Sequence, residues 1–419
     1  MLQNRSLPEA SNEAYRLGNA VLSPVASPAF SLAASVKDGV VYEGSAECGW
    51  GHFLEHMNMQ RTAVHKSLME LTMSVESMGG RIEAYTERDD VVFHVTAPSW
   101  GLKRAFDTMR AIFSFSSFDD ATAESERAII RQEALRERAS QRSHLTLRAE
   151  SDLLEPSPAA RYSLGTEESL AGATGERLSE YKRRVYCREN SFLTLCGGFD
   201  AAEAEDLCGE FYESLPKGEK RSAEISLSLG TGLKRRSYPC QSPPEQIQVV
   251  FGFGLDGEAG VTEAMLFNTL TGAGFSSLFY RRLRHELKLT YTTATFLRRY
   301  PGAGTFRLVF ALNPRDMDRA EEAVFSTLDS IARGEISDED MESAGNRLWG
   351  STVMRLSNVH DYGAFMNRGL ISLGKPRLIA DFRREIEALG RDDMAKFAEK
   401  YMRRDNCSIT RIGQSPQQP

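Results

Sequence analysis

Apolar and polar positions along the 419-residue chain follow an order of elements that occurs twice. In the first half, a helical pattern ends at the glycine pair 79–80. Residues 81–85 and 91–96 are then rich in strand-forming side chains, and a helical pattern over 102–113 follows Pro98. This half is therefore predicted to contain an antiparallel strand pair with helices before and after it.

The second half repeats this order. Residues 280–287 predict a helix, 290–297 and 305–312 predict strands around the turn at 301–304, and 320–332 predict a further helix. The alternation in 305–312 is imperfect, as expected for a strand in a sheet that is covered by helices. The chain is thus predicted to have an α+β fold of two homologous α/β-sandwich domains. Each would contain a mostly antiparallel sheet covered by helices.

A linker is expected between the two halves. Residues 215–222 and 235–244 concentrate proline, glycine, serine and charged side chains, a composition typical of connecting segments. We therefore expect an N-terminal domain at 1–215, a linker at 216–242 and a C-terminal domain at 243–419.

The pentapeptide His52-Phe53-Leu54-Glu55-His56 carries the strongest chemical signal. It has no β-branched residue and no helix breaker, so we expect a helix that places His52 and His56 one turn apart on one face. Two such imidazoles are suited to binding zinc, and Glu55 is suited to accepting a proton from a water molecule. An H-x-x-E-H sequence also arises by chance, and two histidines leave a catalytic zinc one protein ligand short.

A candidate third ligand lies in residues 123–139. Their helical period places Glu126, Glu133 and Glu137 on one stripe with Ile129 and Ile130. A merely solvated face would separate the acids from the isoleucines, so carboxylates on this stripe need a partner, and a metal ion is a good one. We expect Glu133 to be the ligand, and Glu126 to orient a histidine or the substrate.

Residues 47–62 resemble the active-site segment of the pitrilysin/insulinase metallopeptidases, whose reversed zinc motif defines the inverzincins. Residues 126–133 are similar to the third-ligand helix of this family, and the likeness extends over nearly the whole chain. The match is to the two-domain bacterial type that resembles mitochondrial processing peptidase. It implies a zinc metalloendopeptidase with Zn²⁺ held by His52, His56 and Glu133.

The resemblance implies two further site residues. Residues 274–291 are similar to a C-terminal-domain element of the family in which an arginine, and a tyrosine seven residues later, reach the substrate. Arg284 would bind the substrate backbone or carbonyl, and Tyr291 would help to stabilise the oxyanion of the intermediate. Without the resemblance, a basic helix segment for Arg284 and a strand core for Tyr291 would be the favoured interpretation.

Two residues depart from the family pattern. Glu83 stands where the family commonly has a strand asparagine that is thought to hold the substrate backbone. A carboxylate only accepts hydrogen bonds, so we expect Glu83 to bind a substrate amino terminus or a basic side chain. Lys288 stands where the family usually has glycine, which leaves the placement of Tyr291 open.

Composition narrows the functional classes. The formal net charge of −7 gives no reason to expect a nucleic-acid partner. No run of eighteen apolar residues indicates a membrane span, and the first 24 residues lack the apolar core of a signal peptide, so we expect a cytoplasmic protein. The six cysteines form no C-x-x-C pair, and reduced thiols are the simplest interpretation.

The sequence therefore predicts a zinc-dependent endopeptidase that hydrolyses peptides or small unfolded substrates inside a closed chamber. Zinc would lower the pKa of a water molecule, and Glu55 would act as general base. A narrower alternative is a maturation peptidase for one precursor peptide. An alternative of another class is a non-catalytic or partner-dependent subunit that binds or scaffolds, as in the respiratory-complex core proteins that resemble this family. Such proteins typically lose zinc ligands, whereas this chain keeps all three.

The resemblance also implies a dimer. The family builds its chamber from four α+β units, and this chain supplies two. A homodimer is expected because the zinc ligands and the Arg284/Tyr291 pair occur in one chain. A heterodimer with a related chain is the alternative.

Overall fold

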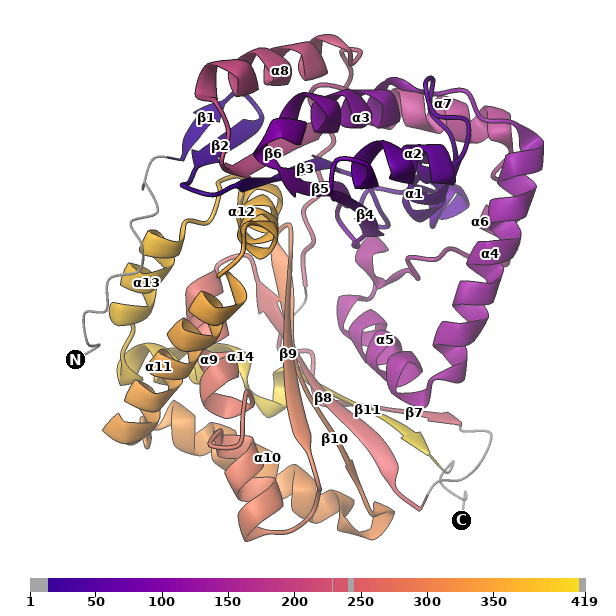
Figure 1. The fold of residues 1–419 in the computed structure, drawn as a ribbon. Helices are drawn as coiled ribbons and strands as arrows, with labels where there is room; N and C mark the ends of the chain where they lie inside the picture. The colour runs from indigo at the N-terminus through magenta and orange to yellow at the C-terminus, as the bar shows by residue number, and fades with distance from the viewer. Residues whose placement is uncertain (1–13, 228, 240–244, 414–419) are drawn as a thin grey trace. The chain divides into compact units, whose positions relative to one another are not determined.

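The computed structural model describes residues 14–227, 229–239 and 245–413. It forms two compact units, each assembled from three segments. Unit 1 comprises Met1–Ala134, Arg161–Ala223 and Val353–Ala380, and unit 2 comprises Leu135–Ala160, Glu224–Thr352 and Asp381–Pro419. Each unit contains one sheet with helices packed on it (Figure 1). The expected α+β fold of two mostly antiparallel, helix-covered sheets is confirmed. The linker at 216–242 stays a prediction.

The described strands and α-helices have the following bounds. The strands are β1 (Tyr15–Leu17), β2 (Ala20–Pro24), β3 (Ala29–Val36), β4 (Arg81–Thr86), β5 (Val91–Pro98), β6 (Ser191–Gly197), β7 (Lys234–Pro239), β8 (Ile247–Asp256), β9 (Thr293–Tyr300), β10 (Ala303–Leu312) and β11 (Cys407–Gly413). The helices are α1 (Trp50–Gln60), α2 (Leu68–Glu76), α3 (Leu102–Ser114), α4 (Asp120–Ala139), α5 (Gln141–Leu154), α6 (Glu167–Ala171), α7 (Gly175–Val185), α8 (Ala201–Glu213), α9 (Val261–Thr271), α10 (Met317–Ala332), α11 (Asp338–Arg355), α12 (Val359–Leu373), α13 (Ile379–Glu387) and α14 (Arg391–Tyr401).

The sheet of unit 1 has the order β1-β2-β6-β3-β5-β4, so β4 is an edge strand. Only β2 and β6 run parallel, and the other neighbours are antiparallel. The register of β4 on β5 pairs Glu83 with His94 and Thr86 with Val91. Cross-strand partners point to the same face of a sheet, so this register determines the face of the sheet to which each side chain of β4 points.

Both faces of the central strands of this sheet are buried. Leu193 and Leu195 of β6 point into the larger core, where α1, α2, α3 and α8 pack. Phe192 and Cys196 point to the other face, where they contact apolar side chains of α12. Successive side chains of a strand point to opposite faces of the sheet, so a single strand contributes to two apolar layers. Figure 1 shows α12 and α3 on opposite sides of the sheet.

The sheet of unit 2 has the order β7-β11-β8-β10-β9 and is built in the same way. Phe251 and Phe253 of β8 meet the ring of Phe325 on α10, at centroid distances of 6.0 and 6.5 Å. The opposite face packs on α5, where Leu145 contacts the cluster around Val250. Gly252 permits this approach, because a Cβ there would lie 2.6 Å from a methyl carbon of Leu153.

One helix from each sequence half belongs to the unit formed mainly by the other half. α5 lies among the first 215 residues yet packs on β8 and β11 of unit 2. α12 comes from the second half yet packs on β3 and β6 of unit 1. Each sheet therefore depends on a helix supplied from far away in the sequence.

Most predicted elements occur with small shifts. β5 begins at Val91 as predicted and α3 begins at Leu102, whereas β9 begins three residues later than the prediction at 290. The predicted helix at 280–287 is a π-helix over Tyr280–Glu286. Among the described residues, no helix is both long and apolar enough to cross a bilayer. The five described cysteines are free and buried, and Cys240 lies outside the described residues.

Candidate metal centre

The start of α1 fixes the motif-bearing helix in place. Gly49 adopts a φ of 83°, and a Cβ there would come within 2.5 Å of the Gly165 backbone, so only glycine fits. The Glu43 carboxylate accepts hydrogen bonds from the backbone N–H groups of Gly49 and Gly51 at 2.7 and 2.8 Å. A carboxylate at this point satisfies N–H groups that lack a partner within the helix and interacts favourably with the helix dipole.

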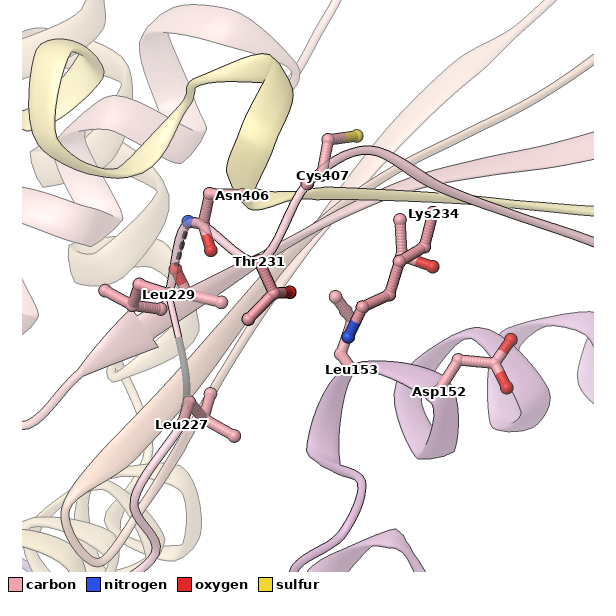
Figure 2. A pocket seen from close by; sticks show the side chains of 11 residues that line it. Asp152, Leu153, Leu227, Leu229, Thr231, Lys234, Asn406 and Cys407 are labelled. Carbon is pink, nitrogen blue, oxygen red and sulfur yellow. Dashed lines mark hydrogen bonds between the residues drawn. The ribbon is translucent and has the colours of Figure 1, made fainter.

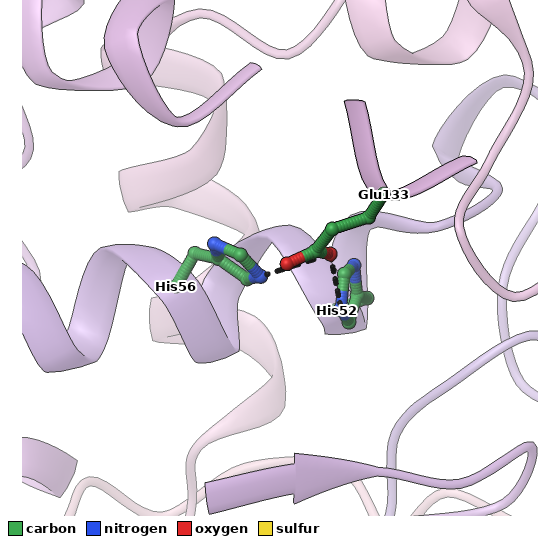
Figure 3. A group of neighbouring side chains, drawn as sticks. All are labelled: His52, His56 and Glu133. Carbon is green, nitrogen blue, oxygen red and sulfur yellow. Dashed lines mark ion pairs between the residues drawn. The ribbon is translucent and has the colours of Figure 1, made fainter. Parts of the chain in front are cut away.

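Three side chains converge from α1 and α4. The Nε2 atoms of His52 and His56 each lie 3.6 Å from the same oxygen, Oε2, of Glu133. One ligand atom from each residue lies within 4.8 Å of the other two. Figure 3 shows the Glu133 carboxylate entering between the two imidazoles. The helical spacing of the pentapeptide and the reach of α4 thus bring the three predicted ligands together.

The donor set fits zinc in its chemistry and, more loosely, in its spacing, with the three ligand atoms within 4.8 Å of one another. Bonds of about 2.1 Å to a tetrahedral ion place neighbouring donor atoms about 3.4 Å apart, close to the two distances of 3.6 Å. Two imidazole nitrogens and one carboxylate are also the donor chemistry of a catalytic zinc site with one position left for water.

The electrostatics of the two histidines differ. Burial, with a smaller contribution from His56, lowers the pKa of His52 to about 3, so its imidazole is neutral and able to bind a cation. Burial alone would also lower the pKa of His56, but the hydrogen bond to Glu126 and the charges of Glu133 and Glu55 together raise it. His56 therefore faces three carboxylates, and this excess of negative charge favours a metal cation.

Glu126 holds His56 in orientation. Its Oε2 lies 3.0 Å from Nδ1 of His56, on the ring edge away from Glu133. With the His56 Nδ1–H donating to this carboxylate, Nε2 keeps its lone pair for a metal. The Nδ1 atom of His52 has no such partner among the described residues.

The predicted stripe on α4 is partly wrong. Ile130 is buried, but Ile129 is 43% exposed. The buried face of α4 is centred on Ala123, Ile130 and Ala134, and the acids lie along one border of it, with Ile129 beyond them. Glu126 is 3% exposed on that border, so the acids do meet a buried surface, although one isoleucine does not.

Glu55 is held from the neighbouring strand. The Thr86 hydroxyl of β4 donates a hydrogen bond to Oε2 of Glu55 at 2.6 Å. Burial raises the pKa of Glu55, with Glu133 adding to the effect and Thr86 and His56 opposing it. A carboxylate with a raised pKa is better suited to take up and release a proton near neutral pH.

Arg284 and Tyr291 lie in unit 2, and the structure brings these two together. The Arg284 guanidinium carbon lies 4.0 Å from the centroid of the Tyr291 ring, and Tyr291 is 73% exposed. Arg284 is carried by the π-helix Tyr280–Glu286, a rare conformation that often occurs at functional sites. Lys288 has a φ of 54°, so a lysine here occupies the left-handed region that glycine adopts without strain.

Glu83 lies on the same strand as Thr86 but on the other face of the sheet. It is paired with His94, and its Oε2 lies 3.5 Å from Nε2 of His360 on α12. Thr86 points to the α1 side, where it meets Glu55. Glu83 is thus only three residues from Thr86 in the sequence, but it points to the face of the sheet opposite to the one on which α1 and the pentapeptide lie.

Sequence reasoning missed Glu43, Thr86 and His360. Each acts through a contact with a residue distant in sequence, so no local spacing marks it. Glu43 has a weak sequence signal, since it is an acidic residue shortly before a helix that begins after a glycine. Thr86 and His360 have no such signal in the sequence.

Unit 2 contains a small hollow away from the candidate metal ligands. It is lined by residues that include Asp152, Thr231, Lys234 and Asn406 (Figure 2). Its volume of about 30 Å³ holds no more than one or two water molecules. It therefore offers no room for a peptide.

Two protein-family models match most of the chain. Residues 21–167 match the family model "Insulinase (Peptidase family M16)", and residues 172–348 match "Peptidase M16 inactive domain". The chain is 21% identical to the uncharacterized zinc protease YmxG of Bacillus subtilis, over 85% of this chain and 86% of that protein. It is 22% identical to the mitochondrial-processing peptidase subunit beta of Neurospora crassa, over 87% and 79% of the two chains.

Solved structures show the same architecture. A protease from Helicobacter pylori superimposes with a TM-score of 0.86 at 17% identity, covering 96% of this chain and 99% of that one. At this identity the likeness establishes the fold alone. The two family models together match most of the chain, so the chain belongs to the insulinase family of peptidases, family M16.

Proposed function

We propose that the protein is a zinc-dependent endopeptidase that cleaves peptides or small unfolded segments. The observation that carries the proposal is the convergence of His52, His56 and Glu133, with two donor distances of 3.6 Å. The names of relatives such as YmxG, a zinc protease, support the metal and the activity.

The residues divide the chemistry among them. A zinc ion held by His52, His56 and Glu133 would act as a Lewis acid and lower the pKa of a bound water molecule toward neutral pH. Glu55 would accept the proton from the attacking water and pass it to the leaving amine. Thr86 would hold the Glu55 carboxylate in place through its hydrogen bond.

Substrate binding is assigned to three residues. We propose that Arg284 contacts the peptide backbone and that Tyr291 donates to the developing oxyanion. The exposed Tyr291 and the half-buried Arg284 are available for these roles. β4 is an edge strand, and such strands bind extended peptides through their backbone groups. Glu83 on that strand would contact a cationic group of the peptide.

The decisive experiment counts zinc and measures cleavage in the same preparation. Zinc per chain is determined by plasma mass spectrometry, and a mixed peptide library is digested with the wild type, Glu55→Gln and Glu76→Gln. Glu76 is an exposed glutamate at the end of α2 and serves as the matched control. We expect one zinc per chain in all three proteins, with cleavage abolished only in Glu55→Gln. A chain that binds no zinc would refute the site.

A non-catalytic or partner-dependent role is the second candidate. It is favoured by the description of the model matched at residues 172–348, an M16 inactive domain. The mitochondrial-processing relative is named as a subunit, which raises the same question of a partner. One zinc per chain without cleavage by the wild type would support this role. Mass photometry of the purified chain would distinguish a homodimer from a monomer, the state expected of a chain whose partner is a different protein.

A further inference from the structure

α12 places a histidine beside the edge strand of unit 1. The Nε2 atom of His360 lies 3.5 Å from Oε2 of Glu83, and its Nδ1 atom lies 2.9 Å from the Thr96 hydroxyl. The Glu83 carboxylate only accepts hydrogen bonds, whereas the Thr96 hydroxyl can also donate. The neutral ring therefore satisfies both neighbours with its proton on Nε2, toward Glu83, and with the Thr96 hydroxyl donating to Nδ1. The Glu83 carboxylate thus selects this tautomer, and the Thr96 hydroxyl is compatible with it.

His360 rests on a buried imidazole. Its ring stacks on that of His94 with a centroid distance of 4.2 Å and an interplanar angle of 12°. Nε2 of His94 lies 2.6 Å from the Ser31 hydroxyl. Burial lowers the pKa of His94 to about 3 and, with Arg81, also lowers the pKa of His360. Both rings are therefore neutral at pH 7, and His360 does not cancel the charge of the carboxylate beside it.

Buried contacts fix α12 in this position. Asn367 accepts hydrogen bonds from the hydroxyls of Ser35 and Thr194 at 2.8 and 3.3 Å. Gly363 lets the helix approach β3, because a Cβ there would lie 2.2 Å from the Ser31 hydroxyl oxygen. His360, one turn before Gly363, is thus held by the packing of the whole helix.

A peptide paired with β4 would place alternate side chains on the two faces of the sheet. Side chains on the α1 side would point toward Thr86 and Glu55. A side chain on the α12 side, opposite position 83, would meet the half-exposed Glu83 carboxylate. Arg81 is 3.8 Å from Glu83, but such an exposed pair contributes little, and a substrate cation can replace it.

We propose that Glu83 and His360 form a recognition position for a lysine or arginine side chain of a peptide bound along β4. The proposal rests on the peptidase function and adds a substrate class to it. Glu83 supplies the charge. His360 acts as a positioning residue that holds one carboxylate oxygen and leaves the other for the substrate.

The test uses pairs of quenched fluorescent peptides that differ only by lysine or norleucine at one scanned position. The selectivity is the ratio of kcat/KM for the two members of a pair. For the wild type we expect a ratio of about 5 at one position, the size of one partly exposed ion pair. Glu83→Gln should bring the ratio to about 1. His360→Ala should lower it severalfold, and His360→Gln should largely restore it, because the amide N–H can replace the Nε2–H.

A matched control and a second readout keep the result interpretable. Asp361 is bonded to Asn358 within α12, so Asp361→Asn should leave the ratio unchanged. Binding of both peptides to the zinc-loaded Glu55→Gln variant, measured by fluorescence anisotropy, reports recognition without turnover. Equal binding of the lysine and norleucine peptides at every position would overturn the proposal. A preference in binding without cleavage by the wild type would instead contradict the peptidase function and leave the recognition position supported.

Discussion

The Nδ1 atom of His56 lies 3.0 Å from Oε2 of Glu126, a residue that is 3% exposed. This contact joins the motif helix α1 to α4, the helix that also carries Glu133. Carboxylates that orient a metal-binding histidine typically affect metal affinity by 10- to 100-fold. The contact therefore has a measurable consequence for zinc binding.

We expect Glu126→Gln to weaken zinc binding by about 10- to 100-fold, because a neutral amide fixes the His56 tautomer less firmly. The measurement is competition for zinc against a chromogenic chelator at constant pH. Glu124, an exposed residue on the same helix that pairs with Arg127, provides the control variant Glu124→Gln with unchanged affinity. Unchanged affinity in Glu126→Gln would show that the contact does not serve the metal.

Thr86→Val should lower kcat by about tenfold while zinc content stays the same. The change removes a hydrogen bond to Glu55, and the loss of one such bond to a charged group corresponds to roughly that factor in rate. Thr86→Ser keeps the hydroxyl and should retain most of the activity. If the valine and serine variants behaved alike, the hydroxyl would have no role in holding Glu55.

The preference for lysine over norleucine should depend on pH. The pKa of His360 is lowered by burial and by Arg81, against the opposing charges of Glu83 and Asp361, with neutral His94 stacked on the ring. The ring should gain its proton only below the ordinary pKa of about 6.5. The ratio of kcat/KM should therefore be constant from pH 8 to 6.5 and fall at lower pH, as His360 becomes positive and neutralises Glu83. The ratio cancels any effect of pH that is common to both peptides. His360→Gln, which has no titrating ring at this position, is the control and should show a ratio that does not change with pH.

Lys288→Gly should stabilise unit 2 by about 1 kcal/mol. Lys288 has a φ of 54°, a conformation that costs non-glycine residues about 1–2 kcal/mol and is partly offset by the greater chain entropy of glycine. Urea denaturation would measure the difference. Lys288→Val, whose branched side chain fits this conformation poorly, should destabilise. A lower stability of the glycine variant would mean that the lysine side chain makes compensating contacts.

Arg368→Ala should destabilise unit 1 by about 3 kcal/mol. Arg368 of α12 donates to the carboxylates of Asp89 and Asp90 at 2.9 Å, and both aspartates are about 1% exposed. Burial raises the pKa of both aspartates and Arg368 opposes it. Without the arginine, two buried carboxyl groups lose their cationic partner, which is costly whether they stay ionised or take up protons. The combined change of Arg368→Ala with Asp89→Asn and Asp90→Asn should recover part of the loss in a denaturation experiment. No recovery would indicate that the arginine acts through packing alone.

Local information in the chain determined much of the fold. The strand pair at β4 and β5 and the helix α3 follow from patterns that involve neighbouring residues only, because side-chain periodicity reflects burial on one face. The spacing of His52 and His56 fixed their common face for the same reason. Ile129 shows where such reasoning fails, since a helical stripe has two borders and the sequence does not state which one is buried.

The sequence alone determined the candidate ligands, the motif and the two-part α+β plan, since each depends on spacing within one element or on a signature of residue types. The tertiary structure decided that Thr86 holds Glu55, that Glu83 points to the α12 face, and that α5 and α12 each complete a sheet formed mainly by the other half of the chain. These contacts join residues far apart in sequence. Strand register and helix docking set them, and both depend on the whole packed unit rather than on local propensity.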